Sequence, residues 1–268
     1  MDISEFNRLH TTSHYSRHPW EIARGKALVS LIRGNIPGRP AALVDVGSGD
    51  AYITNLLQGQ KMADAFFAID NAYTPDIIGS LQKNNDDSPV GYYISIEKFQ
   101  ESHPRVDKAL YLCMDVLEHL KEEGEVLDLI ARKPIPIANV DPISNVVPVD
   151  PAYYFFTVPA FQSVFSNHDT LLGHYRRYTV GRFEKVLTDK GLTVISSGYF
   201  FFSLLLLRWF EKKMLRKKDY SIDNWKGGPL KTKILTSILF VDFKIGDLLK
   251  KCGIRLPGLS CYCICKAS

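Results

Sequence analysis

The stretch AALVDVGSGD at residues 41–50 decides the fold class of this chain. Its first part is a short apolar run, typical of a strand that is buried in a parallel sheet. Two closely spaced glycines, Gly47 and Gly49, follow at once, and only glycine turns sharply at positive φ while letting a ligand approach the backbone closely. The stretch therefore predicts a strand, a tight turn and a helix, with either a bound nucleotide or a plain connection at the turn.

Strand-like and helix-like segments alternate along the rest of the chain. Apolar residues recur at helical spacing in segments 18–34, 50–58, 116–130, 180–190 and 234–249. Besides the first strand, apolar stretches predict strands at 63–70, 91–96, 109–113, 153–158, 192–197 and 259–265. Strands separated by helices predict βαβ units and a mainly parallel sheet. Segment 134–151 holds five prolines without a period and predicts a loop.

The length suits one large globular α/β domain over residues 1–268, and two small domains are the alternative. No secretory signal is visible, and five cysteines without a framework spacing indicate a reducing compartment, so we expect a cytoplasmic protein. The net charge of +4 is uneven, because residues 208–233 carry nine Lys or Arg against three Asp or Glu. A nucleic-acid binder would spread its positive charge differently, so we expect no nucleic-acid partner.

The residues after the glycines disfavour two common nucleotide sites. A nicotinamide-binding fingerprint would need a third glycine at position 52, where Tyr52 stands. A phosphate-binding P-loop would end in Gly-Lys followed by Ser or Thr, which is also absent from the stretch. The turn therefore lacks the spacing that clamps a pyrophosphate.

Two acidic residues flank the predicted turn in space. Asp70 ends the second predicted strand, 25 residues after Asp45. A carboxylate there can accept hydrogen bonds from both ribose hydroxyls of a nucleoside, at about 1.5–3 kcal/mol for such charge-assisted bonds. The alternative for Asp70 is a solvated acid at a strand end. Asp45 can bond an amino group of the ligand, directly or through water, or cap the following helix.

The chain resembles the class I S-adenosylmethionine-dependent methyltransferases, in particular a bacterial branch that modifies small molecules, saccharides or lipids. The matching stretches are VDVGSGDAYITNLL (44–57), FFAID (66–70), MDVLEHL (114–120), TVPAFQSVFSNHDTLLGHYRRYT (157–179) and LPGLSCYCICK (256–266). The resemblance implies a Rossmann-like, mostly parallel seven-stranded α/β sheet with helices on both faces and an antiparallel C-terminal strand. Ala51 departs from the usual third glycine, and loop 134–151 replaces the usual Pro-Gly-Gly turn.

The resemblance also implies S-adenosylmethionine as the cofactor, over the carboxyl ends of the first, second and fourth strands. This place agrees with the general rule for ligands of open α/β sheets. Ser95, Ile96 and Glu97 would lie near the adenine, while Cys113 and Met114 would approach the sulfonium through their backbone. The expected cofactor-binding residues are Asp45, Gly47, Ser48, Gly49, Asp70, Asn71, Ile96, Cys113 and Met114.

Methyl transfer requires the alignment of nucleophile, methyl group and sulfur, and the exclusion of water. A hydroxyl or protonated amine acceptor also needs a base, and histidine titrates near neutrality. His119 in the DVLEHL run, and His168 and His174 after the fifth strand, are the candidate catalytic residues. Structural roles in the core or in the loop are the alternatives.

Three further residues are expected to bind the acceptor substrate, namely Glu118, Tyr175 and Arg176. Arg176 and Arg177 can bind an anionic group such as phosphate or carboxylate, and an ion pair within the domain is the alternative. Residues 1–36 form an N-terminal helical segment that either folds over the cofactor as a lid or packs as an ordinary helix.

Residues 199–250 predict an apolar and basic helical insertion near the substrate side. The apolar run 199–207 is far shorter than the about 20 residues that span a bilayer. Segment 199–218 fits peripheral contact with the inner membrane face, and a roof over the substrate pocket is the alternative. Under either reading we expect a small-molecule or lipid-linked acceptor.

Cys261, Cys263 and Cys265 alternate and therefore share one face of the last strand. Zinc sites favour Cys-x-x-Cys pairs, so we interpret this face as buried and expect no metal site.

The glycine turn, Asp70 and the resemblance together predict a methyltransferase that uses S-adenosylmethionine on a small-molecule, saccharide or lipid-linked acceptor. One alternative is a nucleotide-sugar or nicotinamide enzyme on a related sheet. The other is a non-catalytic domain that keeps the cofactor-binding fold.

Overall fold

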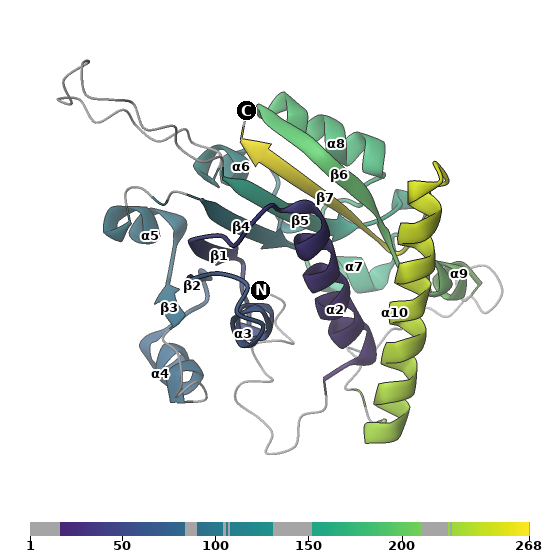
Figure 1. The fold of residues 1–268 in the computed structure, drawn as a ribbon, viewed down its shortest axis with the longest axis horizontal. Coiled ribbons are helices and arrows are strands. Elements are labelled where there is room, and N and C mark those ends of the chain that lie inside the picture. Colours follow the sequence, from purple (N-terminus) through teal and green to yellow (C-terminus); the bar gives the residue numbers. More distant parts are fainter. Residues whose placement is uncertain are drawn as a thin grey trace.

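A seven-stranded sheet organises the computed structural model, which describes residues 17–83, 90–103, 106, 108–130, 152–210, 225 and 227–267. The strand order is β3-β2-β1-β4-β5-β7-β6 (Figure 1). The strands are β1 (Ala42–Val46), β2 (Ala65–Ile69), β3 (Val90–Tyr93), β4 (Ala109–Met114), β5 (Tyr153–Pro159), β6 (Leu192–Phe200) and β7 (Ser260–Ala267). Strand β7 runs antiparallel to β5 and β6, whereas β1 to β5 pair in parallel. The predicted fold class is confirmed.

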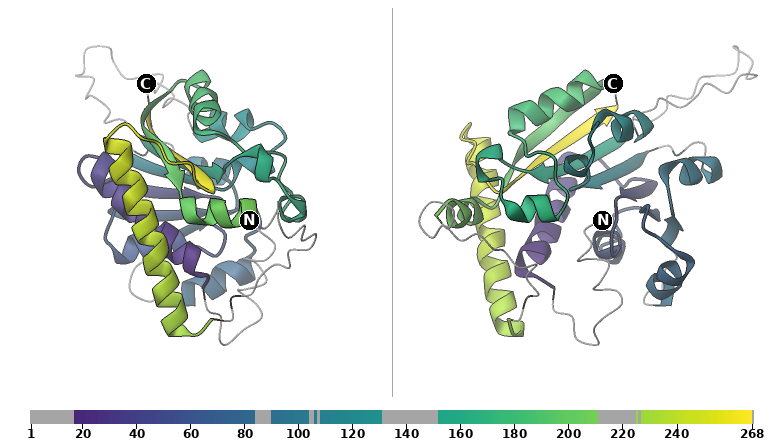
Figure 2. Two further views of the ribbon diagram at one scale, coloured as in Figure 1. Left: turned by 90° about the vertical axis from the view of Figure 1, so that its right-hand side faces the viewer. Right: turned by 180° about the vertical axis from the view of Figure 1, so that it is seen from behind.

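Helices cover both faces of this sheet (Figures 1 and 2). One face packs against α2 (Pro19–Asn35), α3 (Tyr52–Gly59), α4 (Pro75–Lys83) and α10 (Pro229–Lys251). The other face packs against α5 (Ile96–Ser102), α6 (Gly124–Ile130) and α8 (Val180–Asp189). Two separate apolar cores result, one on each side, as expected for strands whose side chains alternate between faces.

Strands β4 and β7 show how the apolar sequence fills both cores. Leu110 and Leu112 enter the core beneath α2 and α10, while Cys113 enters the opposite one. Cys261, Cys263 and Cys265 lie together in that second core as buried free thiols. The predicted buried cysteine face is therefore confirmed, and burial raises the pKa of the Cys263 thiol well above its ordinary value.

The helix predicted over 116–130 is wrong as one continuous element. The chain forms a short 3-10 turn, η1 (Leu117–His119), and becomes extended at Leu120 before α6 begins. The carbonyl of Glu118 accepts a hydrogen bond from Tyr175 N–H at 2.8 Å, a contact that replaces the next helical bond. A tertiary contact thus overrides the helical pattern of this segment.

Other boundaries also differ from the prediction. The third strand ends at Tyr93, because the Ser95 side chain accepts a hydrogen bond from Lys98 N–H at 3.2 Å and caps α5. The helix predicted over 234–249 is longer and begins at Pro229, a favourable residue for a first helical turn. The predicted loop 134–151 lies outside the described residues.

The N-terminal helix α2 lies beside α10 on one face of the sheet (Figures 1 and 2). Ala23, Ala27 and Leu28 of α2 are fully buried in this contact and against the sheet. The Thr236 hydroxyl of α10 donates to the Pro19 carbonyl at 3.3 Å. In the described part of the chain, no helix is both long and apolar enough to cross a membrane.

Candidate functional site

The candidate site lies at the carboxyl ends of β1, β2 and β4. These strands are parallel neighbours, so the segments that follow them emerge at the same edge of the sheet. The chain passes from β1 to β2 and β3 on one side, and then returns to β4 on the other side of β1. Open α/β sheets bind their ligands at such a reversal of strand order.

The glycine turn after β1 is held by backbone contacts to the end of β2. Gly47 has φ +74° and Gly49 has φ +55°, the left-handed region that glycine adopts at low cost. The N–H groups of Gly47 and Ser48 both donate to the Ile69 carbonyl, at 2.8 and 3.1 Å. A Cβ on Gly47 would lie 2.4 Å from a methyl carbon of Val116, so the turn also packs tightly against the segment after β4.

Asp70 is buried at this turn, with 3% of its surface exposed. One carboxylate oxygen accepts from Gly49 N–H and the other from Ala72 N–H, both at 3.0 Å. The alternative of a solvated strand-end acid is therefore wrong. A carboxylate has about four lone-pair positions, so two remain for a ligand. The neighbouring Asn71 is exposed.

Asp45 lies beneath the turn and is also buried. Its carboxylate accepts a hydrogen bond from the Thr54 hydroxyl of α3 at 2.7 Å. Burial, reinforced by the negative charge of Asp70, raises the pKa of Asp45 to about 7. A positively charged ligand group beside Asp45 would favour the ionised carboxylate, because an opposite charge lowers a carboxyl pKa.

Asp115 connects the end of β4 to the N-terminal helix. It has φ +54°, which is uncommon for a residue other than glycine, and forms an ion pair with Arg24 of α2. Its other carboxylate oxygen accepts from the Thr157 hydroxyl of β5 at 3.0 Å. Burial raises the pKa of Asp115, but the charge and hydrogen bond of Arg24 outweigh it and hold this pKa below its usual value.

The residues expected near the adenine and the sulfonium lie at the same edge of the sheet, close to the ends of β3 and β4. Cys113 and Met114 are the last residues of β4, and both are buried. Ile96, expected at the end of a strand, instead opens α5 and is buried beneath it.

Three polar side chains converge next to this edge, and we call them the Glu-His-His cluster. They are Glu118 and His119 of η1 and His174 of the loop that precedes α8. One ligand atom from each lies within 4.8 Å of the others. The rings of His119 and His174 meet edge to face, with centroids 4.7 Å apart. Burial, together with the negative charge of Asp115, raises the pKa of Glu118 well above its ordinary value.

Asp169 of α7 (Asn167–Leu171) organises the loop that carries His174. Its buried carboxylate contacts the imidazole Nδ1 of His174 at 2.9 Å and accepts from Arg177 Nε–H at 2.7 Å. It also accepts from Ser166 N–H at 2.9 Å, in a capping box that begins the helix. Burial would raise the pKa of Asp169, but the hydrogen bonds from His174 and Arg177 hold it well below its usual range.

The remaining predicted acceptor residues lie around this loop. Arg176 pairs with Glu123 at 3.0 Å and donates to the Leu120 carbonyl at 2.9 Å, and these contacts hold its side chain beside the loop. Tyr175 is half-exposed at the surface. His168 lies on α7, and among the described residues it is not one of the three whose ligand atoms converge.

Sequence reasoning assigned no role to Asp115 or Asp169. The capping pattern from Ser166 to Asp169 would have identified the start of α7, because a hydroxyl residue followed by an acid at this spacing commonly begins a helix. Asp115 carries no comparable local pattern, since both of its partners lie far away in the sequence.

Comparisons with known proteins place this fold among solved structures. No family model and no curated protein matches the sequence. A chain from the complex of the Haloferax volcanii Trm112 methyltransferase activator with a protein assigned as a methyltransferase superposes with a TM-score of 0.50. It is 13% identical, over 92% of this chain and 93% of that one. The N-methyltransferase NodS from Bradyrhizobium japonicum WM9, in complex with S-adenosyl-L-homocysteine, also superposes with a TM-score of 0.50. It is 17% identical, over 73% of this chain and 87% of NodS. This likeness establishes a shared fold.

Proposed function

We propose that this protein is a class I methyltransferase that uses S-adenosylmethionine. The observation that carries the proposal is the braced turn at Gly47 and Gly49, with two buried carboxylates beside it, at the reversal of strand order. The shared fold with NodS, which was solved with S-adenosyl-L-homocysteine, supports the same cofactor. Tyr52, which stands where a nicotinamide site needs its third glycine, disfavours the alternative of an NAD enzyme.

The buried carboxylates fit the polar groups of S-adenosylmethionine. Asp70 has lone pairs left for the ribose hydroxyls, and Asp45 can pair with the amino group of the methionine part. Gly47, Ser48 and Gly49 would line that part of the cofactor. Asn71, Ile96, Cys113 and Met114 complete the proposed set around the ribose, adenine and sulfonium. When bound, the cofactor supplies an electrophilic methyl group.

The acceptor would enter beside the Glu-His-His cluster. A carboxylate can only accept, so the contact with Asp169 places a proton on Nδ1 of His174 and leaves Nε2 as its accepting nitrogen. His174 is therefore the best-oriented candidate for a base, with His119 beside it and His168 as the third candidate. Glu118, Tyr175 and Arg176 are the proposed contacts to the acceptor.

Ligand binding tests the proposed cofactor. S-adenosyl-L-homocysteine should raise the melting temperature, because a ligand at a hundred times its Kd adds about 2.7 kcal/mol, or about 5–10 °C for a chain of this size. NAD should leave the melting temperature unchanged. A shift with NAD alone would overturn the proposal. Binding of S-adenosyl-L-homocysteine without its production from S-adenosylmethionine, over a panel of acceptors, would indicate the non-catalytic alternative.

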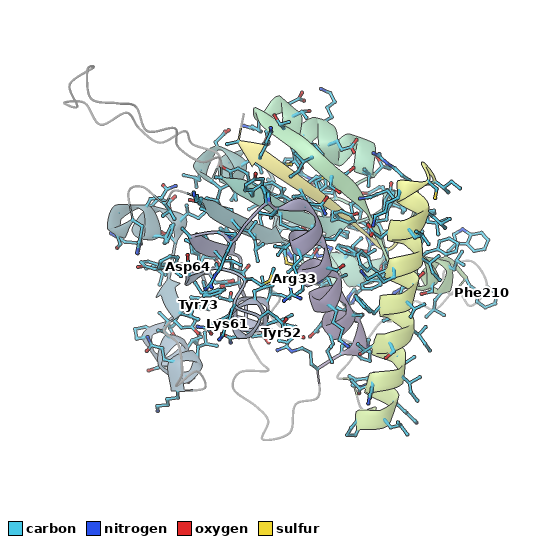
Figure 3. All side chains as sticks on the ribbon, in the orientation of Figure 1. Arg33, Tyr52, Lys61, Asp64, Tyr73 and Phe210 are labelled. Carbon is cyan, nitrogen blue, oxygen red and sulfur yellow. The ribbon has the colours of Figure 1, made fainter. Side chains whose placement is uncertain are left out.

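We also propose peripheral contact with the membrane through an outer apolar face. Helix α10 buries Thr236, Leu239 and Phe243 on one side and exposes an apolar stripe on the opposite side. The neighbouring α9 (Phe202–Phe210) adds four exposed residues, and Phe210 lies at the edge of the molecule (Figure 3). The outer apolar face consists of Leu206, Leu207, Trp209, Phe210, Leu230, Ile234, Ile238, Val241, Ile245 and Leu248.

Charges around the outer apolar face favour an anionic lipid surface as its occupant. Three exposed lysines of α10 flank the stripe, namely Lys231, Lys233 and Lys244. The acids of α10 are engaged within the protein, because Asp242 accepts from Ser203 of α9 and Asp247 pairs with Lys251. An apolar stripe between cations is the pattern of helices that lie in a membrane interface. The basic residues 212–218, to which the sequence also pointed, lie outside the described residues.

Vesicle sedimentation tests this contact. The protein should bind vesicles that contain about 30% phosphatidylserine and should dissociate from them at high salt, because salt screens the attraction between charges. The variant I234S/I238S/I245S should bind these vesicles at least tenfold more weakly, since each buried methylene contributes about 0.8 kcal/mol. The control L171S/I254S changes exposed apolar residues elsewhere and should bind as the wild type does. Equal binding by both variants, or a stable dimer that the triple variant abolishes, would contradict membrane contact.

A further inference from the structure

We infer that Glu118, His119 and His174 bind a divalent transition-metal ion. Their ligand atoms all lie within 4.8 Å of one another. Ligands at about 2.0–2.2 Å from one ion lie about 3–3.5 Å apart, so small side-chain rotations would complete the coordination. The spacing of the cysteines led us to expect no metal, and these three residues were not considered together as ligands. In the chain, α6, β5 and α7 separate Glu118 and His119 from His174.

Glu118 points to an absent cation most directly. Its side chain is fully buried, and neither carboxylate oxygen has a hydrogen-bond partner among the described residues. Buried polar groups in folded proteins are almost always bonded, and an exception calls for an explanation such as an ion. The backbone of Glu118 is held in place, because its carbonyl accepts a hydrogen bond from the N–H of Tyr175 at 2.8 Å.

His174 is oriented as metal-binding histidines usually are. Metal-ligating imidazoles commonly donate their second ring nitrogen to a carboxylate, which fixes the ring and makes the ligand more basic. Here Nδ1 contacts Asp169 at 2.9 Å, and Arg177 and Ser166 hold that carboxylate in place. Nε2 is thereby left as the ligand atom of His174.

His119 completes the set from the residue next to Glu118. Its ring meets the ring of His174 at 81°, an edge-to-face arrangement that brings the two imidazoles together without stacking them. The ligands thus come from the two segments that carry the candidate catalytic and acceptor-binding residues, one after β4 and one after β5.

The donor set indicates which ions fit. One carboxylate and two imidazoles suit zinc, manganese, iron or cobalt, whereas magnesium and calcium prefer oxygen ligands throughout. Three protein ligands leave coordination positions open for an exogenous ligand. The role of the ion rests on the proposed function. A metal at this position narrows the acceptor to a molecule with a hydroxyl or another metal-binding donor. With the ion bound to Nε2, His174 acts as a ligand rather than as a base.

Metal binding is tested with the full chain, stripped of metal by a chelator and titrated with MnCl2 and with ZnCl2. Calorimetry should show one site per chain, and Glu118→Gln should weaken it at least tenfold while keeping the side-chain shape. Glu122→Gln, which changes an exposed acid nearby in the sequence, should bind as the wild type does. His174→Ala, checked for folding by circular dichroism, should also lose the site.

Wild-type protein that binds neither ion at 1 mM, or a Glu118→Gln variant with unchanged affinity, would overturn the metal site. S-adenosyl-L-homocysteine binding, measured on the same preparations, keeps the two proposals apart. Metal binding without S-adenosyl-L-homocysteine binding would support the metal site and remove the methyltransferase assignment. S-adenosyl-L-homocysteine binding without metal binding would overturn only the metal site.

Discussion

Replacing Asp169 with alanine should lower the free energy of unfolding by about 3–5 kcal/mol, the usual effect of breaking a buried charge pair by removing one partner. Asp169 is fully buried and holds Arg177, His174 and the start of α7 together. Without Asp169, the largely buried guanidinium of Arg177 loses its ion pair and, among the described residues, keeps its hydrogen bond to the Ala160 carbonyl at 3.1 Å. Urea denaturation at pH 7 measures the change.

A surface pair provides the control for this variant. Asp128→Ala removes the partner of Lys190 where the acid is 60% exposed, and should cost less than about 1 kcal/mol. The pH adds a second readout. Because the pKa of Asp169 is lower in the folded state, its contribution is present above the unfolded pKa of about 3.9 and is lost as pH falls further. The difference between wild type and Asp169→Ala should therefore narrow below pH 4. Equal losses for the two variants at pH 7 would contradict the role of Asp169.

Replacing Asp70 with alanine should weaken the binding of S-adenosyl-L-homocysteine at least tenfold, which corresponds to about 1.4 kcal/mol. The variant removes the proposed acceptor of the ribose hydroxyls and also the bond that holds Gly49 N–H. Asp70→Asn keeps an oxygen for that bond but lacks the charge, so its loss of affinity should be smaller. Calorimetric titration of the three proteins gives the affinities.

Asp64→Ala is the matched control for the Asp70 variants. Asp64 lies just before β2, its side chain is 65% exposed, and its ion pair with Arg39 is on the surface. This control should bind S-adenosyl-L-homocysteine as the wild type does. An unchanged affinity in Asp70→Ala would remove the main support for the proposed cofactor site.

The glycine turn shows how far local sequence reaches. An apolar run that breaks into Gly47 and Gly49 predicted a buried strand and a turn with positive φ, and both are present. Side-chain alternation likewise predicted that Cys261, Cys263 and Cys265 share a buried face. These predictions succeed because strand period and backbone φ depend on neighbouring residues.

The segment after β4 shows where local sequence is insufficient. Its apolar spacing predicted a continuous helix, but the contact between Glu118 and Tyr175 stops the helix after a single turn. Glu118 lies in η1 after β4 and Tyr175 in the loop before α8, and their meeting depends on the pairing of β4 with β5. Helical periodicity contains no information about such a contact.

The sequence by itself therefore determined the α/β class, the seven strands, the turn at Gly47 and the position of Asp70 at the end of the second strand, because each follows from short-range pattern and backbone preference. Only the tertiary structure decided that Asp70 is buried rather than solvated, that Arg24 reaches Asp115, and that His174 lies beside Glu118 and His119. The physical reason is that burial, ion pairs and the meeting of these side chains arise between segments that are distant in the sequence. Only the parallel sheet brings those segments to one edge.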